Sequence, residues 1–187
     1  MAHRTISDEE LLGRALELFR TYGFEGVSLK RLAEATGLEK ASLYYRFPGG
    51  KDDIAMAVVN GVAAAMQHLV FDPLHTGEGT PRKRLQGVIE RLREFYACGT
   101  KSCVFDLMSI PGASPELKAS LRTTMKAWLD SFAAIGRESG LASGQARTRA
   151  EEAIGRIEGG LVLARVMGDG AAFERALKTV PELLGTA

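Results

Sequence analysis

The feature that most constrains this chain is a set of three short helix-forming segments within its first fifty residues, separated by glycines. The first begins at a serine cap, Ser7, with a glutamate three residues later, and ends at Gly23. The second extends from a cap at Ser28 to Gly37, and the third follows at once over residues 39–46. Two short helices joined by a tight turn that contains glycine form the layout of a helix-turn-helix unit.

The third segment has one face for the core and other faces for a partner. Leu43 and Phe47 are four residues apart, so both can pack on the two preceding helices. Neighbouring side chains on a helix point about 100° apart, so we expect Tyr44 to be partly packed and Tyr45 to be more exposed. A helix fits the major groove of DNA, where its outer side chains can reach bases and phosphates. The candidate DNA-contacting residues of this segment are Lys40, Ser42, Tyr44, Tyr45 and Arg46.

Positive charge is concentrated in the same region. The whole chain has a net charge of only +1, so bulk composition does not indicate a nucleic-acid partner. Between Ser28 and Lys51, however, five basic residues stand against two acidic ones, Glu34 and Glu39, which gives a local charge of +3. We therefore add the basic residues Lys30 and Lys51 to the candidate DNA-binding residues. The sequence predicts double-stranded DNA as a partner of this region.

The remainder of the chain is predicted to be helical, which makes the fold class all-α with about nine helices. A Pro-Gly-Gly break precedes residue 51, and strand-like alternation is nearly absent. Residues 72–80 are expected to form a loop because Asp, Pro, Thr and Gly are crowded there. We expect a helix-turn-helix DNA-binding domain over residues 1–50 and an effector-binding and dimerisation domain over residues 51–187. The later helices are expected at about residues 51–70, 81–96, 114–138, 145–166 and 171–184.

Several function classes find little support in the sequence. The apolar stretches are shorter than the ~20 residues that a membrane span needs, and the N-terminus lacks the apolar core of a signal peptide, so we expect a cytoplasmic protein without a membrane partner. Cys98 and Cys103 lack metal-ligand spacing, and no catalytic motif is present. We expect neither an enzyme nor a bound cofactor or metal.

Methionine and aromatic residues cluster in the second half of the chain. They can be plain core, but such side chains also form adaptable walls of apolar ligand pockets. We therefore name five of them as candidates for a small-molecule effector pocket: Phe105, Met108, Met125, Trp128 and Phe132.

The last two predicted helices offer a surface for a homodimer. Their apolar residues follow helical spacing, and Gly160 would allow a close approach between helices. Two such helices from each subunit would form a four-helix bundle. The same residues could equally be intrachain core, and we expect some of each. The candidate interface residues are Ile154, Ile157, Leu161, Ala164, Phe173 and Leu177.

The amino-acid sequence of the N-terminal region resembles that of a known family. Residues 28–54, SLKRLAEATGLEKASLYYRFPGGKDDI, and residues 15–27, ALELFRTYGFEGV, resemble the DNA-binding region of the TetR family of repressors. The resemblance is strong over about residues 8–56. It implies that Lys51 meets a backbone phosphate of DNA. It also implies operator contacts from Ser28, Lys40, Ser42, Tyr44 and Tyr45.

One residue departs from the family pattern. Glu39 stands where the family often has a serine or threonine that caps the third helix, and loss of a good cap costs ~1 kcal/mol. The carboxylate could accept a hydrogen bond from a cytosine amino group, or it could simply sit at the positive end of the helix, which we favour. The Pro-Gly-Gly sequence and the later paired glycines resemble the LmrA-like subgroup, whose members respond to drugs or flavonoid-type molecules.

Together these features predict a ligand-responsive transcriptional regulator. We expect a repressor that binds a palindromic operator as a homodimer and is released by a small apolar or aromatic effector. The alternatives are a helical protein-interaction module and a regulator that senses redox state or metal through Cys98 and Cys103.

Overall fold

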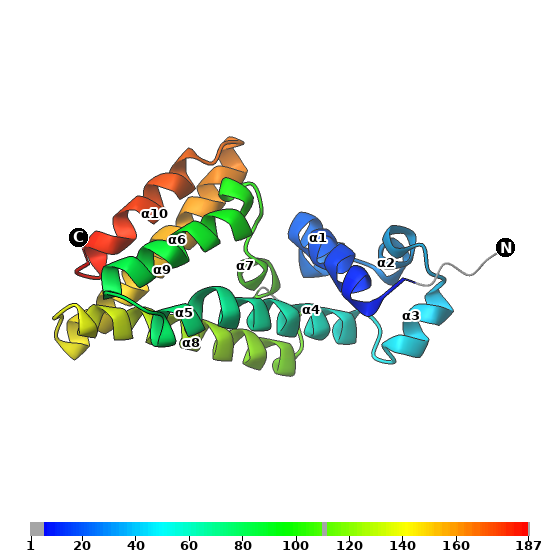
Figure 1. The fold of residues 1–187 in the computed structure, drawn as a ribbon. Coiled ribbons are helices and arrows are strands. Elements are labelled where there is room, and N and C mark those ends of the chain that lie inside the picture. Colours follow the sequence, from blue (N-terminus) through cyan, green and yellow to red (C-terminus); the bar gives the residue numbers. More distant parts are fainter. Residues whose placement is uncertain (1–5, 110–111, 187) are drawn as a thin grey trace. The chain divides into compact units, whose positions relative to one another are not determined.

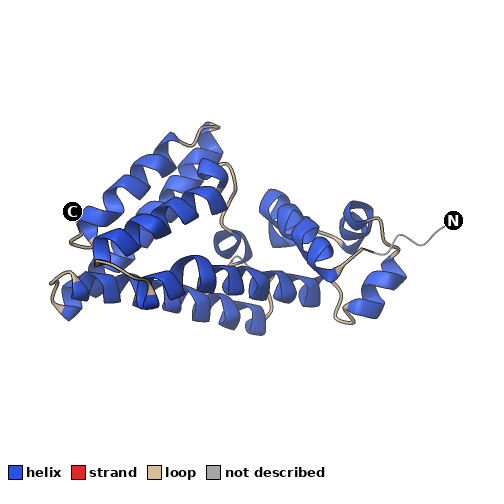
Figure 2. Ribbon diagram, viewed as in Figure 1, coloured by secondary structure: helices blue, strands red, loops and turns tan. Residues whose placement is uncertain are grey.

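The chain folds into helices joined by short loops (Figures 1 and 2). The computed structural model describes residues 6–109 and 112–186, and within these ranges there is no strand. The predicted all-α fold class is therefore confirmed. The helices are α1 (Asp8–Gly26), α2 (Leu29–Thr36), α3 (Lys40–Arg46), α4 (Lys51–Met66), α5 (Asp72–Thr76), α6 (Pro81–Phe95), α7 (Val104–Met108), α8 (Pro115–Glu138), α9 (Ser143–Met167) and α10 (Ala171–Leu183).

The fourth helix is longer than predicted. A π-helical segment, η1 (Gln67–Phe71), connects α4 directly to α5, so helix continues to Thr76. The prediction of a loop from residue 72 was thus wrong over residues 72–76. Pro73 has no N–H to donate, but it lies in the first turn of α5, and the π-type bond from the Asp72 N–H to the Gln67 carbonyl takes the helix past it.

The predicted helix ends are confirmed by their caps. The side chains of Ser7, Ser28 and Thr80 each accept a hydrogen bond from the backbone N–H three residues later. Gly37 ends α2 in the left-handed conformation, with φ 71° and ψ 18°. Gly23, with φ 66°, breaks the helical conformation where the sequence predicts the end of the first helix, but α1 continues to Gly26 beyond this kink. These local signals explain why sequence patterns placed the N-terminal helices well.

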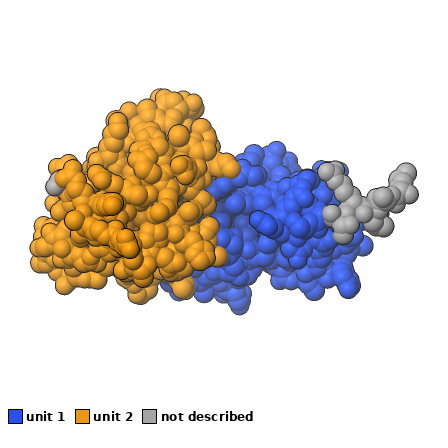
Figure 3. Space-filling model, in the orientation of Figure 1, with its two compact units in different colours: residues 1–63, 104–122 blue, residues 64–103, 123–187 orange. Residues whose placement is uncertain are grey.

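The described chain divides into two compact units (Figure 3). The first contains residues 1–63 and 104–122, and the second contains residues 64–103 and 123–187. In the first unit, α1 buries Leu11, Ala15 and Phe19, and α2 and α3 bury Leu32 and Leu43. This structural division does not follow the functional boundary expected between residues 50 and 51, which stays a prediction.

In the second unit, α9 and α10 pack closely. A Cβ added at Gly160 would lie 3.0 Å from the Cα of Phe173 and 3.1 Å from the Cβ of Ala176. The Phe173 ring in turn meets the buried Tyr96 ring edge-on, with centroids 5.7 Å apart. Gly160 therefore allows close approach to α10 of the same chain.

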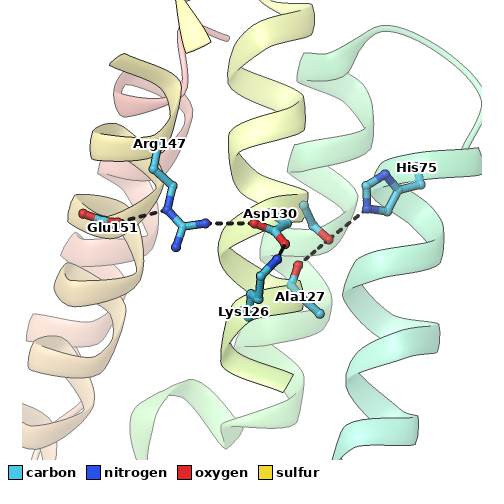
Figure 4. Close-up of polar contacts among 7 residues, drawn as sticks. His75, Lys126, Ala127, Asp130, Arg147 and Glu151 are labelled. Atoms are coloured by element: carbon cyan, nitrogen blue, oxygen red, sulfur yellow. Dashed lines mark hydrogen bonds and ion pairs between the residues drawn. The ribbon is translucent and has the colours of Figure 1, made fainter. Parts of the chain in front are cut away.

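A polar network joins α8 to α9 in the second unit (Figure 4). The Asp130 carboxylate accepts hydrogen bonds from Lys126 and, at 2.8 Å, from Arg147, which also donates to Glu151. The Lys126 ammonium and then the Arg147 guanidinium hold the pKa of Asp130 below its usual value. Nearby, the His75 ring lies 2.9 Å from the buried Ser131 hydroxyl. These contacts fix α8 against its neighbours.

One helical run is long and apolar enough to cross a membrane when judged by length and composition alone. It covers residues 51–76, so the sequence prediction that nothing resembles a span was too strong. The core helix of a soluble protein passes the same test, and 44% of the apolar window is buried inside the protein. The run is therefore weak support for a membrane segment.

Candidate nucleic-acid interface

The helix-turn-helix is built by α2, a turn at Gly37, and α3. The Gly37 N–H donates to the Ala33 carbonyl at 2.9 Å, and the buried Thr36 hydroxyl donates to Leu32 at 2.7 Å. Leu38 in the turn is half-buried. The end of α2 is thus held by its own backbone and side chains, which fixes where α3 begins.

The outer face of α3 is arranged as the sequence predicts. Leu43 is fully buried and Phe47 is half-buried, so this side of the helix faces the core. Tyr44 is 50% exposed and its ring lies against Gly50, whereas Tyr45 is 89% exposed. Ser42 is half-buried. The expectation that Tyr44 is partly packed and Tyr45 more exposed is therefore confirmed.

The basic residues around α2 and α3 differ in how strongly they are held. Lys30 is exposed and 3.8 Å from Glu34, and Arg31 lies 4.0 Å above the Tyr22 ring. Lys40, at the start of α3, is exposed. Contacts at exposed positions such as these are weak, so the side chains can turn toward a polyanion at little cost.

Arg46 is used inside the protein. Its guanidinium donates to the Ile6 carbonyl at 2.9 Å and to Asp8 at 3.0 Å, and three quarters of its side chain is buried. These bonds use one nitrogen of the guanidinium and tie the end of α3 to the start of α1. The expected DNA contact of Arg46 stays a prediction and would have to use its remaining donors.

Lys51 is held in a similar way. Its ammonium donates to the Phe24 carbonyl at 3.1 Å and lies 4.1 Å above the Phe24 ring. The expected phosphate contact stays a prediction. It would have to use the remaining donors of this ammonium, which can supply three.

The predicted pocket residues fall into both compact units. Phe105 and Met108 are buried in the first unit, and Met125 is half-buried in the second. Trp128 and Phe132 are fully buried on α8, with ring centroids 5.9 Å apart in an edge-to-face pair. Within the described ranges, the Trp128 indole Nε1 is buried without a hydrogen-bond partner.

The predicted dimer residues are already covered by the chain itself. All six side chains are buried in the single chain, where α9 packs on α10, so they do not form a free surface. The sequence could not separate this core from an interface, because both require apolar residues at helical spacing. The prediction of a dimer interface is corrected for all six buried residues: Ile154, Ile157, Leu161, Ala164, Phe173 and Leu177.

A different face of α9 was missed. Gly155, Gly159, Val162 and Val166 follow spacings of four, three and four residues, so they share one side of the helix. We name these four residues, together with Leu163 and Met167 at the edge, the outer α9 face. Val166 is 73% exposed and Met167 70%. The signal in the sequence was the apolar run at the end of α9, residues 161–167, which only Arg165 interrupts.

The two cysteines lie in different surroundings. Cys98 is exposed, and Cys103 is buried within 3.6 Å of the Tyr96 hydroxyl. In the part of the chain that the structure describes, no three His, Cys, Asp or Glu side chains form a group that could hold a metal ion. Nothing in this geometry supports the sensing alternative.

Comparison with known protein families shows to which class of protein this chain belongs. Residues 11–58 match the bacterial regulatory proteins of the tetR family, and residues 81–179 match the C-terminal domain of LmrA/YxaF-like transcriptional regulators. The chain belongs to the TetR family of transcriptional regulators, with an LmrA/YxaF-like C-terminal domain. The predicted function, a DNA-binding, ligand-responsive regulator of the repressor type, is confirmed, and the alternatives are not favoured.

Individual relatives cover nearly the whole chain. The chain is 25% identical to the HTH-type transcriptional regulator LmrA of Bacillus subtilis, over 95% of this chain and 96% of that protein. It is 27% identical to YxaF, an uncharacterized HTH-type transcriptional regulator of the same organism, over 98% of each. A TetR transcriptional regulator from Legionella pneumophila shares the fold with a TM-score of 0.84 at 20% identity, over 96% of this chain and 98% of that one.

Proposed function

We propose that this regulator binds a palindromic operator as a homodimer and releases it when a small apolar or aromatic effector binds the C-terminal body. The observation that carries the proposal is the exposed surface of α3 in the helix-turn-helix. On this surface Lys40 and the 89% exposed Tyr45 point away from the core. The relatives are transcriptional regulators, which fits this function.

The surface of α3 suits the major groove. A recognition helix lies there with its N-terminal residues toward the base edges. Lys40 supplies a cation for phosphates or guanine, and the Tyr45 ring offers apolar contact and a hydroxyl. Ser42 and Tyr44, which are less exposed, would contact the DNA at the edge of the interface. Ser28 caps α2, and Lys30 on the same helix is exposed, so both would lie at the edge of the DNA and Lys30 would contact a phosphate.

The outer α9 face supports the homodimer. Val166 lies nine residues from the buried Ile157, about two and a half helical turns, so the two point to opposite sides of α9. A helix that is apolar on opposite sides needs a partner for each of them. The chain itself covers one side, and we assign a second copy of the chain to the other. Gly155 and Gly159 would allow the two copies of α9 to approach closely.

The effector is proposed to bind near Trp128. A buried N–H without an acceptor costs about 1–3 kcal/mol, and a ligand oxygen or nitrogen would recover part of this cost. The neighbouring Phe132 and Met125 provide apolar contact for an aromatic ligand. We therefore expect an effector that combines an aromatic ring with a hydrogen-bond acceptor. Phe105 and Met108 belong to the other compact unit, and their part in an effector pocket stays a prediction.

The switch is proposed to act through the long helical run. Residues 51–76 include parts of both compact units, so a tilt of this run would reach the residues that precede it. A coupling free energy of about 1–3 kcal/mol would lower operator affinity ~5- to 150-fold, which is enough for derepression. A DNA-binding regulator of this kind is expected to act in the cytoplasm.

The test is a binding titration of the purified chain on DNA from immediately upstream of its own coding region, at several salt concentrations. We expect saturable binding of two chains to one short palindrome. Binding that is weak, steeply dependent on salt and indifferent to sequence would contradict the proposal. Aromatic compounds with and without a hydrogen-bond acceptor are then compared for their ability to release the DNA.

A further inference from the structure

Glu39 occupies the N-cap of α3, but its side chain does not cap the helix. Its backbone is extended, with φ −74° and ψ 151°, and no side-chain hydrogen bond is made to the first turn. The caps of other helices behave differently: the hydroxyl oxygens of Ser7, Ser28 and Thr80 accept backbone N–H groups at 3.1, 3.3 and 3.3 Å. The Glu39 carboxylate is therefore exposed and not engaged by its own helix.

A carboxylate that makes no hydrogen bond with its own helix is an unusual group at the N-terminus of α3. Position 39 directly precedes Lys40, at the end of α3 that meets base edges in a helix-turn-helix complex. Phosphates repel a carboxylate, so it weakens DNA binding unless it finds a hydrogen-bond donor on a base. The other acidic side chain of this region, Glu34, lies instead beside Lys30 on α2.

The chemistry of the major groove restricts which donor this can be. A carboxylate only accepts hydrogen bonds, and the donors in the groove are the amino groups of cytosine and adenine. Adenine presents its N7 acceptor next to its amino group, and that lone pair repels a carboxylate. Cytosine presents its amino group without a neighbouring acceptor. Cytosine is thus the base that a carboxylate at position 39 selects.

We propose that Glu39 is a specificity-determining residue that selects cytosine at one position of each operator half-site. The inference rests on the proposed operator binding by α3. It departs from the reading that the sequence favours, a purely electrostatic role at the positive end of the helix, because the carboxylate makes no hydrogen bond with the first turn of α3. That electrostatic role would alter helix stability and leave base preference unchanged.

The experiment is selection of bound DNA from a random pool, with the full-length chain and three variants. Glu39→Gln has nearly the same shape but presents a donor beside an acceptor, the pattern that matches adenine. Glu39→Ser restores the side-chain cap and removes the carboxylate. Glu34→Gln is the matched control, because it removes the same charge from α2. Thermal melting of each variant confirms that it is folded.

The wild-type chain is expected to enrich a palindrome with cytosine at one position of each half-site. At that position Glu39→Gln should prefer adenine and Glu39→Ser should lose the preference, with every other position unchanged in both. At that position the wild-type chain is expected to bind a half-site with cytosine roughly 5- to 150-fold more tightly than one with another base. Glu34→Gln should keep the cytosine.

Two results would overturn the inference, and they can be told apart. If the wild-type chain enriches a palindrome and the Glu39 variants select the same bases with equal or higher affinity, only the role of Glu39 is wrong. If the wild-type chain enriches no palindrome, the proposed operator binding fails and the role of Glu39 fails with it.

Discussion

The outer faces of α3 and α9 are both exposed, yet they are built from opposite chemistry. Along α3, the side chains that leave the core are a lysine and tyrosines, Lys40, Tyr44 and Tyr45. Along α9, the outer side carries glycine and the aliphatic Val162 and Val166. The first surface suits phosphates and base edges, and the second suits only another apolar surface. This difference is what the proposed function expects, with α3 facing DNA and α9 facing a second copy of the chain.

This difference also explains how well each surface could be predicted from the sequence. On α3 the exposed Lys40 carries a charge that a core would not tolerate, so this surface stands out in the sequence. On α9 the buried Ile157 and the exposed Val166 are the same kind of residue, and only packing tells them apart. Charge changes on either outer face test whether the two faces serve different partners, and changes in the packing of α9 test why one of its sides is left outside.

The largest effect is expected from a charge placed on the outer α9 face. Val166→Glu would bring two carboxylates together in the proposed dimer, so the chain should become monomeric while it stays folded. Because a monomer reads only one half-site, operator affinity should fall by more than about 100-fold. Analytical ultracentrifugation and a DNA titration measure both changes.

Gln145→Glu is the control for the outer α9 face: it adds the same charge to the first turn of α9, and it should leave the dimer intact. A Val166→Glu variant that remains dimeric would refute this interface.

A smaller effect is expected from the loss of one lysine on α3. Lys40→Ala should weaken operator binding ~10-fold and make the salt dependence less steep, because each dimer loses two phosphate or base contacts. Lys178→Ala removes the same charge from an exposed position on α10 and is the matched control. Equal losses in both variants would show that only the overall charge of the protein matters.

The buried side of α9 predicts a change in stability. In Gly160→Ala the new methyl group meets α10 backbone at 3.0 Å, and overpacking costs about 1–3 kcal/mol, more than the ~1 kcal/mol that alanine gains in helix propensity. We expect a net loss of about 1 kcal/mol in the free energy of unfolding. Gly61→Ala, an exposed position of α4 with open space around it, should be neutral or stabilising. A stabilised Gly160→Ala variant would contradict the close packing of α9 on α10.

The smallest effect concerns the polar link between α8 and α9. Asp130→Asn should cost at most about 1 kcal/mol at pH 7, since its ion pairs with Lys126 and Arg147 are exposed. The pKa of Asp130 is lowered in the folded chain, so its contribution is present above the unfolded value of 3.8 and is lost as the pH falls through the folded value. The stabilities of the wild-type chain and the variant should therefore converge in acid. A difference that persists below the lowered pKa of Asp130 in the folded chain would point to packing instead.

The sequence was informative where local chemistry decides the structure. Serine caps and glycines with positive φ placed the N-terminal helices, and the exposures of Tyr44 and Tyr45 followed from helical periodicity. It failed where distant contacts decide. One nitrogen of the Arg46 guanidinium is hydrogen-bonded to Asp8 at the start of α1, thirty-eight residues away, and no local pattern reveals that pairing.

The same limit applies to the body of the protein. An apolar residue on α9 can face α10 or a second chain with the same spacing, so the six predicted interface residues turned out to be buried within the chain. The helix through Pro73 was missed because a π-type turn, which has no sequence signature, precedes it.

The most direct test of the account is the operator affinity of Tyr45→Ala, measured beside the wild-type chain on the same palindrome at one salt concentration. Tyr45 is 89% exposed, so its loss should leave the melting temperature and the dimer unchanged. The account predicts that specific binding is lost while weak, salt-dependent binding to any DNA remains. Wild-type affinity in a folded Tyr45→Ala dimer would contradict the claim that α3 reads the operator.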